Sequence, residues 1–162
     1  YRYYNTFNVK PAYEFGYGLS YTNYKYNNIK VSSPVMNKKL TVTVDVTNTG
    51  KVAGKEVVQL YITTPAGKLD KPSAELKGFA KTGLLQPGQT EKVAFTLTEN
   101  DLASFNTNAT AWIADAGKYT VKIGASSLNI KQSATFKLAK DVITEKCNKV
   151  LVPQVTINEL HK

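Results

Sequence analysis

Strict alternation of apolar and polar residues constrains the fold of this chain more than any other feature. In residues 40–47 the apolar positions are Leu40, Val42, Val44 and Val46, and the intervening positions are polar or charged. Successive side chains of a β-strand point to opposite faces of its sheet, so these four side chains share one face. The segment therefore predicts a strand with one buried and one solvated face.

The same two-residue period recurs along the chain in β-branched and aromatic residues, and a helical period is nearly absent. Further strands are expected at residues 56–63, 74–81, 91–98, 119–123 and 128–138, with one short helical turn in 99–105. Residues 48–54 hold two glycines suited to positive φ and predict either a hairpin or a sheet-to-sheet crossing. About seven short strands without strand–helix alternation predict an all-β fold, a two-sheet antiparallel sandwich of about 100 residues.

Aromatic residues are concentrated at the start of the chain. Eight of the ten tyrosines fall in the first 26 residues, and residues 13–22 alone hold four aromatics and two glycines. Large exposed apolar patches usually mark interaction sites, so this segment is expected to dock against another folded unit. The candidate docking residues are Tyr1, Arg2, Tyr3, Tyr4, Phe15, Tyr17 and Tyr21.

The pattern divides the chain into three parts. Residues 1–23 are the expected docking segment, residues 24–138 the sandwich, and residues 139–162 a C-terminal tail. The tail is expected to lie along a surface, because it contains the apolar residues Val150, Leu151, Val152, Val155, Ile157 and Leu160. The first residue is not Met and no signal peptide is recognisable, so the chain is expected to be part of a longer protein.

Composition narrows the class of protein. The chain is 42% hydrophobic, which is typical of a globular domain, and no apolar run reaches the ~18–20 residues of a membrane span. Cys147 is the single cysteine, so no internal disulfide can form, although this does not define the compartment. Of the 21 basic residues behind the net charge of +9, only Arg2 is an arginine, and the lysines are scattered. Lysines on a solvated surface are therefore favoured over a nucleic-acid site.

Residues that could carry catalysis or bind a metal are sparse. His161, the only histidine, lies one residue from the end of the chain, so no Ser-His-Asp or Cys-His arrangement is expected, and no residues have metal-ligand spacing. The acids nearest to loops are expected to be solvated or to cap helices, and they are Asp70, Glu75, Glu99, Asp101 and Asp115. We therefore expect no catalytic residue, no metal and no cofactor in this chain.

The aromatic residues leave two interpretations open. Tyrosines can stack on sugar rings, since each offers an apolar face and a polar tip, and they can equally fill a seam between domains. Their position in a turn-rich segment favours the seam. Trp112, the only tryptophan, precedes a strand-connecting turn and is expected to pack in the core or at a sheet end.

These residues carry a resemblance to a known family. Residues 1–4 and 10–22 resemble the junction after the second catalytic domain of glycoside hydrolase family 3 enzymes, the β-glucosidase and β-xylosidase family. The rest of the chain, up to about residue 138, is similar to that family's C-terminal fibronectin type III-like domain, an immunoglobulin-like sandwich. The matching segments are 57–61, 75–79, 85–88, 95–97, 102–105, Trp112 and 117–127.

The resemblance implies a non-catalytic scaffold domain. The parent enzyme would be a retaining, exo-acting β-glucosidase, or next a β-xylosidase, that removes terminal β-linked sugars from oligosaccharides without a metal. Its catalytic residues would lie in the preceding domains, so these 162 residues alone are expected to be inactive. The expected partners are the catalytic domains of the same polypeptide, docked on the N-terminal aromatics, and neither nucleic acid nor membrane. Because the family is often exported in bacteria, a periplasmic or secreted location is expected.

Two rival classes of function remain open. The first is a binding module that anchors the parent enzyme to an oligo- or polysaccharide or another polymer through exposed aromatics and lysines. The second is a basic sandwich that binds nucleic acid, for which binding should fall steeply with salt concentration. The scaffold interpretation instead predicts that removing the domain destabilises the parent enzyme.

Overall fold

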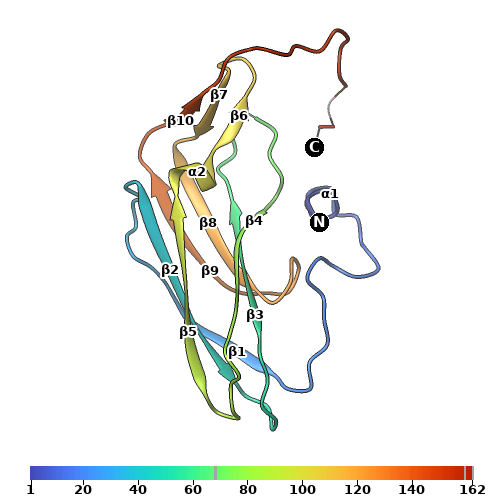
Figure 1. The fold of residues 1–162 in the computed structure, drawn as a ribbon, viewed down its shortest axis with the longest axis vertical. Coiled ribbons are helices and arrows are strands. Elements are labelled where there is room, and N and C mark those ends of the chain that lie inside the picture. Colours follow the sequence, from blue (N-terminus) through green and yellow to red (C-terminus); the bar gives the residue numbers. More distant parts are fainter. Residues whose placement is uncertain (68, 159, 162) are drawn as a thin grey trace.

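Two antiparallel β-sheets pack face to face around one hydrophobic core (Figure 1). A computed structural model describes residues 1–67, 69–158 and 160–161. The elements are α1 (Arg2–Thr6), β1 (Tyr24–Val31), β2 (Lys39–Asn48), β3 (Val57–Thr63), β4 (Glu75–Lys81), β5 (Thr90–Thr98), α2 (Glu99–Leu102), β6 (Ser104–Asn106), β7 (Ala111–Ala114), β8 (Gly117–Gly124), β9 (Ile130–Leu138) and β10 (Val142–Lys146). The two large sheets have the strand orders β1-β2-β5 and β4-β3-β8-β9, and a small third sheet has the order β10-β7-β6. The predicted all-β antiparallel sandwich is thus confirmed.

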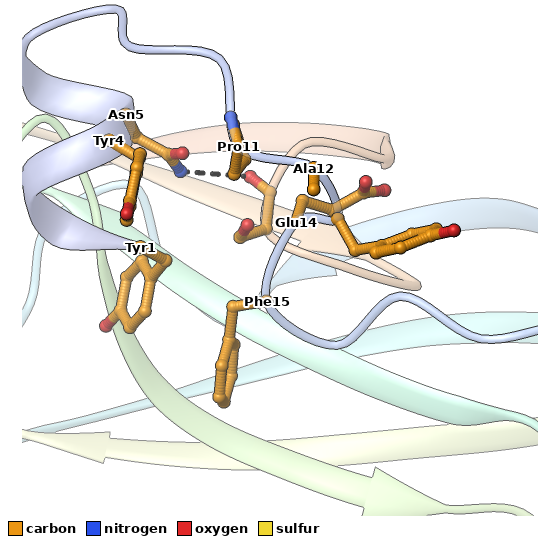
Figure 2. A pocket seen from close by; sticks show the side chains of 9 residues that line it. Tyr1, Tyr4, Asn5, Pro11, Ala12, Glu14 and Phe15 are labelled. Carbon is orange, nitrogen blue, oxygen red and sulfur yellow. Dashed lines mark hydrogen bonds between the residues drawn. The ribbon is translucent and has the colours of Figure 1, made fainter.

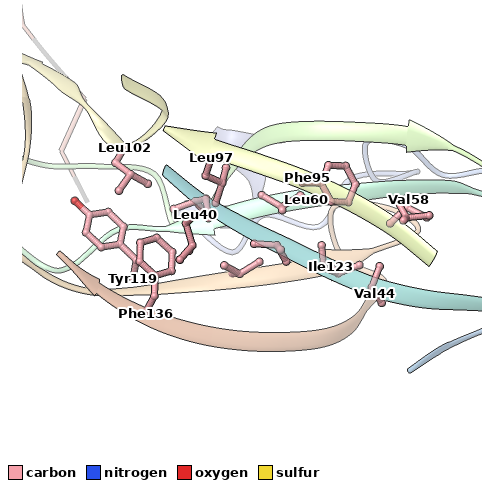
Figure 3. Packing of buried hydrophobic residues seen from close by; sticks show 14 of the residues in the cluster. Leu40, Val44, Val58, Leu60, Phe95, Leu97, Leu102, Tyr119, Ile123 and Phe136 are labelled. Carbon is pink, nitrogen blue, oxygen red and sulfur yellow. The ribbon is translucent and has the colours of Figure 1, made fainter. Parts of the chain in front are cut away.

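The core is built from the alternating positions that the sequence indicates. All four predicted inward residues of segment 40–47 have no exposed surface, and β2 pairs in uninterrupted register with β5. From the facing sheet, Leu60 on β3 lies opposite Ile123 on β8, and both are fully buried. Figure 3 shows these side chains meeting Leu40 and Phe95 between the sheets. Burial of apolar area is the main favourable term for a fold of this kind.

Residues 48–54 carry the chain from one large sheet to the other, so of the two predicted alternatives the crossing is the one observed. The expectation of positive φ at Gly50 and Gly54 is wrong, because neither has it. Gly50 is required for a different reason. A Cβ atom at this position would lie 2.0 Å from Oγ1 of Thr22, so only glycine lets the crossing approach the chain before β1.

Asn48, at the end of β2, joins three separate segments and is fully buried. Its amide nitrogen donates to the carbonyl oxygens of Val52 and Leu85, each at 2.8 Å. Its Oδ1 accepts from Oγ1 of Thr22 at 2.6 Å and from the backbone nitrogen of Gly50 at 3.0 Å. Two donated and two accepted bonds use the full capacity of the amide side chain.

Tyr119 fixes the entry into β8. Its hydroxyl donates to the carbonyl oxygen of Asp115, four residues earlier, at 2.6 Å, in the manner of the tyrosine corner of immunoglobulin-like sandwiches. Its ring stacks on that of Phe136, with centroids 5.3 Å apart and planes 10° apart. Burial raises the pKa of this hydroxyl, which keeps it protonated as a donor.

Two of the acids expected near loops lie in different environments: Asp101 caps a helix, and Asp115 is buried in an ion pair. Asp101 caps α2, since its Oδ2 accepts from the backbone nitrogen and from Oγ1 of Thr98, each at 2.7 Å, as predicted. The expectation of a solvated Asp115 is wrong. This residue is buried and pairs with the equally buried Lys71, whose Nζ lies 2.6 Å from Oδ2. The tertiary fold brings the two charges together across 44 positions of sequence.

Strand pairing continues beyond residue 138. β10 lies in the segment expected to be a tail and pairs antiparallel with β7. The expectation that this tail lies along a surface stays a prediction. The structure leaves at least 61% of each later apolar side chain exposed, namely Val150, Leu151, Val152, Val155, Ile157 and Leu160. Among the described residues, no helix is long and apolar enough to cross a membrane.

Candidate functional site

The predicted docking segment folds back along the four-stranded sheet (Figure 1). The hydroxyl of Tyr1 accepts a hydrogen bond from the backbone nitrogen of Leu76 at 2.8 Å, and its ring lies 5.7 Å from that of Tyr61. At the end of α1, Oγ1 of Thr6 accepts from the backbone nitrogen of Ser73 at 3.0 Å. These contacts hold α1 against the start of β4.

Arg2 lies beside a carboxylate of β4. Its Nη1 is 3.2 Å from Oε1 of Glu75, and Nζ of Lys77 is 3.1 Å from Oε2 of the same residue. Glu75 is therefore a strand residue that bridges two cations, and the expectation of a solvated loop acid is wrong here. Because 60% of the Arg2 side chain is exposed to solvent, its pair with Glu75 contributes at most about 1 kcal/mol and orients Arg2 more than it stabilises the fold.

The second half of the docking segment is fixed on the loop after β8. Oε1 of Glu14 accepts from Oγ of Ser126 at 2.9 Å, and the carbonyl oxygen of Phe15 accepts from the backbone nitrogen of Ser127 at 2.9 Å. Gly16 has φ +83°, and a Cβ atom there would lie 2.2 Å from Nε2 of Gln59. A side chain at position 16 would collide with Gln59 and would strain the backbone, so only glycine fits there.

The backbone of the segment is held, yet most of its large side chains remain in solvent. The predicted docking residues with at least two-fifths of their surface exposed are Tyr3, Tyr4, Phe15, Tyr17 and Tyr21. Tyr1 is half-buried against its own sheet. Tyr13 and Leu19 are 72% and 90% exposed and were missed as candidates, although they belong to the same aromatic run.

A pocket of about 440 Å³ opens between α1 and residues 11–15 (Figure 2). The rings of Tyr1 and Phe15, with centroids 5.2 Å apart, lie along one side of it. Asn5 of α1 and Glu14 of the loop add polar groups to its lining. Aromatic walls with few polar groups are typical of a site that receives a ligand or a partner's side chain.

Trp112 and Phe105 form a second, smaller aromatic feature. They lie opposite each other on β7 and β6, with ring centroids 5.7 Å apart in an edge-to-face arrangement. Trp112 is 41% exposed, so it packs on the small sheet and does not enter the core.

His161 and Cys147, the residues considered for nucleophilic catalysis, both lie at solvent-accessible positions. Nδ1 of His161 lies 3.1 Å from Oδ2 of Asp70, and both side chains are about half exposed or more. Cys147 is a free, partly exposed thiol. Across residues 1–67, 69–158 and 160–161, no group of three or more histidine, cysteine or acidic side chains could hold a metal ion.

Glu56 is a carboxylate whose ionisation is altered by burial. Burial raises the pKa of Glu56, and the hydrogen bond from the Tyr26 hydroxyl, at 2.7 Å from Oε1, and the charge of Lys131 only partly oppose this. Burial likewise raises the pKa of Tyr26, so its hydroxyl stays a donor. The carboxylate holds β1 to the start of β3.

Replacing Glu56 by glutamine is expected to flatten the pH dependence of stability. The pKa of Glu56 in the folded state lies above its ordinary value of 4.5. Between these two pKa values the folded state binds more protons than the unfolded state, so the free energy of unfolding falls as pH rises through this range. Glu56→Gln keeps an acceptor for Tyr26 and removes this fall, which urea unfolding from about pH 4 to pH 8 would measure. The exposed Glu145→Gln removes the same charge and should leave the slope unchanged. Equal slopes for wild type and Glu56→Gln would contradict the expectation.

Comparison with known proteins identifies the domain. A family model described as a fibronectin type III-like domain matches residues 56–127, which run from the start of β3 to the loop after β8. The chain therefore contains a fibronectin type III-like domain. The chain is 42% identical over 139 residues to the β-glucosidase BoGH3A of Bacteroides ovatus, a match that covers 85% of this chain and 18% of the relative.

Solved structures agree with this assignment. β-Glucosidase 3B from Thermotoga neapolitana, in complex with α-D-glucose, is 51% identical to this chain with a TM-score of 0.83. The match covers 87% of this chain and 19% of that one. A family 3 β-glucosidase of Bifidobacterium adolescentis is 34% identical with a TM-score of 0.79, over 85% and 20%. The chain therefore spans about a fifth of the length of the proteins that it matches.

Proposed function

We propose that this domain is a non-catalytic, C-terminal scaffold of a glycoside hydrolase family 3 enzyme, whose catalytic domains dock on its N-terminal segment. The observation that carries this proposal is a segment whose backbone is fixed to the sandwich while its aromatic side chains stay exposed. Such a surface loses apolar exposure when a partner covers it. The relatives are β-glucosidases about five times longer than this chain, so they contain further sequence that can supply the covering domains.

The parent enzyme is proposed to be a retaining, exo-acting β-glucosidase, with β-xylosidase activity as the next alternative, and to be periplasmic or secreted. A retaining glycosidase needs two carboxyl groups about 5–5.5 Å apart beside the scissile bond, and both would lie in the preceding domains. The scaffold would act on catalysis indirectly, because a small displacement of an active site lowers the rate by large factors.

Truncation of the full-length parent before Tyr1 tests the scaffold. We expect the parent to hydrolyse an aryl β-glucoside or an aryl β-xyloside, the truncated parent to lose activity and to melt at a lower temperature, and the isolated 162 residues to be inert. A truncated parent that keeps full activity and its melting temperature would refute the proposal.

A polysaccharide-binding module is the second candidate, and it is favoured by one observation, the exposed pair of Trp112 and Phe105 on the small sheet. Aromatic faces of this kind can stack on sugar rings. Binding of the isolated domain to insoluble glucan, lost in Trp112→Ala, would support this function.

A further inference from the structure

The pocket between α1 and residues 11–15 is rich in aromatic faces. Tyr1 and Phe15 lie 5.2 Å apart on one side, and Tyr13, which also lines the pocket, has its ring 5.0 Å from that of Tyr17. The face of an aromatic ring carries negative electrostatic potential and attracts a cation placed over it. The walls of the pocket therefore favour a positively charged occupant.

Two polar side chains of the pocket, Asn5 and Glu14, offer acceptor oxygens. Asn5 uses its amide nitrogen on the carbonyl oxygen of Ser127, at 3.4 Å, which leaves its Oδ1 as an acceptor. Glu14 is held by Ser126 through Oε1, and an ionised carboxylate only accepts. Among the described residues, no lysine or arginine pairs with Glu14, although the chain has a net charge of +9.

We infer that this pocket binds a guanidinium group, the end of an arginine side chain that the catalytic domains present to it. Guanidinium is planar, positively charged, carries five N–H donors and no acceptor, and stacks on aromatic rings. It matches a pocket of acceptor oxygens, one carboxylate and aromatic walls. A sugar brings as many acceptors as donors and no charge, so it matches less well. The inference rests on the proposed function, because that function supplies the partner.

Titration of the 162-residue chain with methylguanidinium tests the chemistry directly. Amide chemical shifts of Asn5, Phe15 and Ser127 should change saturably, with a Kd on the order of 10 mM for so small a probe. Methylammonium tests charge alone, and glucose tests the sugar alternative. Both should cause much smaller changes at these amides.

Two substitutions test the contributions of the carboxylate and of the aromatic wall to binding separately. Glu14→Gln should weaken methylguanidinium binding about tenfold, because it removes the charge and keeps the shape. Phe15→Leu should weaken it about threefold, since it keeps apolar volume and loses the aromatic face. The matched control Glu145→Gln, which removes an exposed carboxylate on β10, should leave binding unchanged. A Glu14→Gln variant that binds as well as the wild type would overturn the inference.

The outcomes for the arginine and for the scaffold can be told apart. If truncation before Tyr1 destabilises the parent but methylguanidinium does not bind, or glucose binds in its place, the scaffold stands and the guanidinium site is wrong. If methylguanidinium binds but truncation is harmless, the scaffold is wrong, and with it the assignment of the arginine to the catalytic domains. If both hold, Glu14→Gln in the full-length parent should also lower its melting temperature.

Discussion

Replacing Phe136 by alanine is expected to lower the free energy of unfolding by about 3–5 kcal/mol. Phe136 lies on β9 directly opposite Tyr119 of β8, is 1% exposed, and stacks on that tyrosine (Figure 3). Truncation removes the buried ring and leaves a cavity in the core between the two large sheets. The sheets cannot close fully over the cavity. The variant therefore loses the transfer free energy of the buried ring and also bears the free-energy cost of the cavity.

Urea unfolding of wild type and Phe136→Ala measures this effect. The matched control is Phe79→Ala on β4, where the ring is 73% exposed and its removal should cost less than about 1 kcal/mol. Comparable losses in the two variants would mean that Phe136 is not a core residue in solution.

Replacing Asn48 by aspartate is expected to lower the free energy of unfolding by about 3–5 kcal/mol near neutral pH. The substitution is isosteric, so it creates no cavity. It replaces an amide nitrogen that donates to the carbonyl oxygens of Val52 and Leu85 by an oxygen that repels them. It also places a carboxylate at a position with no exposed surface, where ionisation is costly.

The loss in Asn48→Asp should depend on pH. A buried carboxylate has a raised pKa, so the variant should be least destabilised below about pH 4 and lose stability as pH rises above it. Asn106→Asp serves as the control, because Asn106 only accepts from the backbone nitrogen of Ala109, at 3.0 Å, and aspartate can do the same. Equal urea midpoints for the two variants at neutral pH would contradict the role assigned to Asn48.

The long strands could be predicted from the sequence because their pattern is local. In β2 and β5, a buried face and a solvated face alternate along each strand, and the residue types match that alternation directly. β6 and β10 show no such pattern, since each has at most five residues and no fully buried position. The small sheet forms through pairing with β7, a property of the assembled chain.

The candidate site was only partly predictable, for the same reason. The aromatic run is visible in the sequence, and so is its likeness to a docking junction. The pocket depends on Asn5, Glu14 and Ser127, which are brought together from α1, a loop and the turn after β8. Ser127 lies more than 100 residues from the other two, and no local pattern marks a serine whose hydroxyl will lack a partner.

The sequence by itself determined which residues form the core strands, the all-β class and the aromatic N-terminal segment, because hydrophobic alternation and residue type act over a few neighbouring positions. Only the tertiary structure decided which polar groups are buried and with what partner. Asp115 appears in the sequence as an ordinary turn acid, yet it pairs with Lys71 inside the fold. Asn48 appears as a turn residue, yet it joins three segments. The energy of a polar side chain depends on whether distant parts of the chain supply its partners, and that is settled only when the sheets have packed.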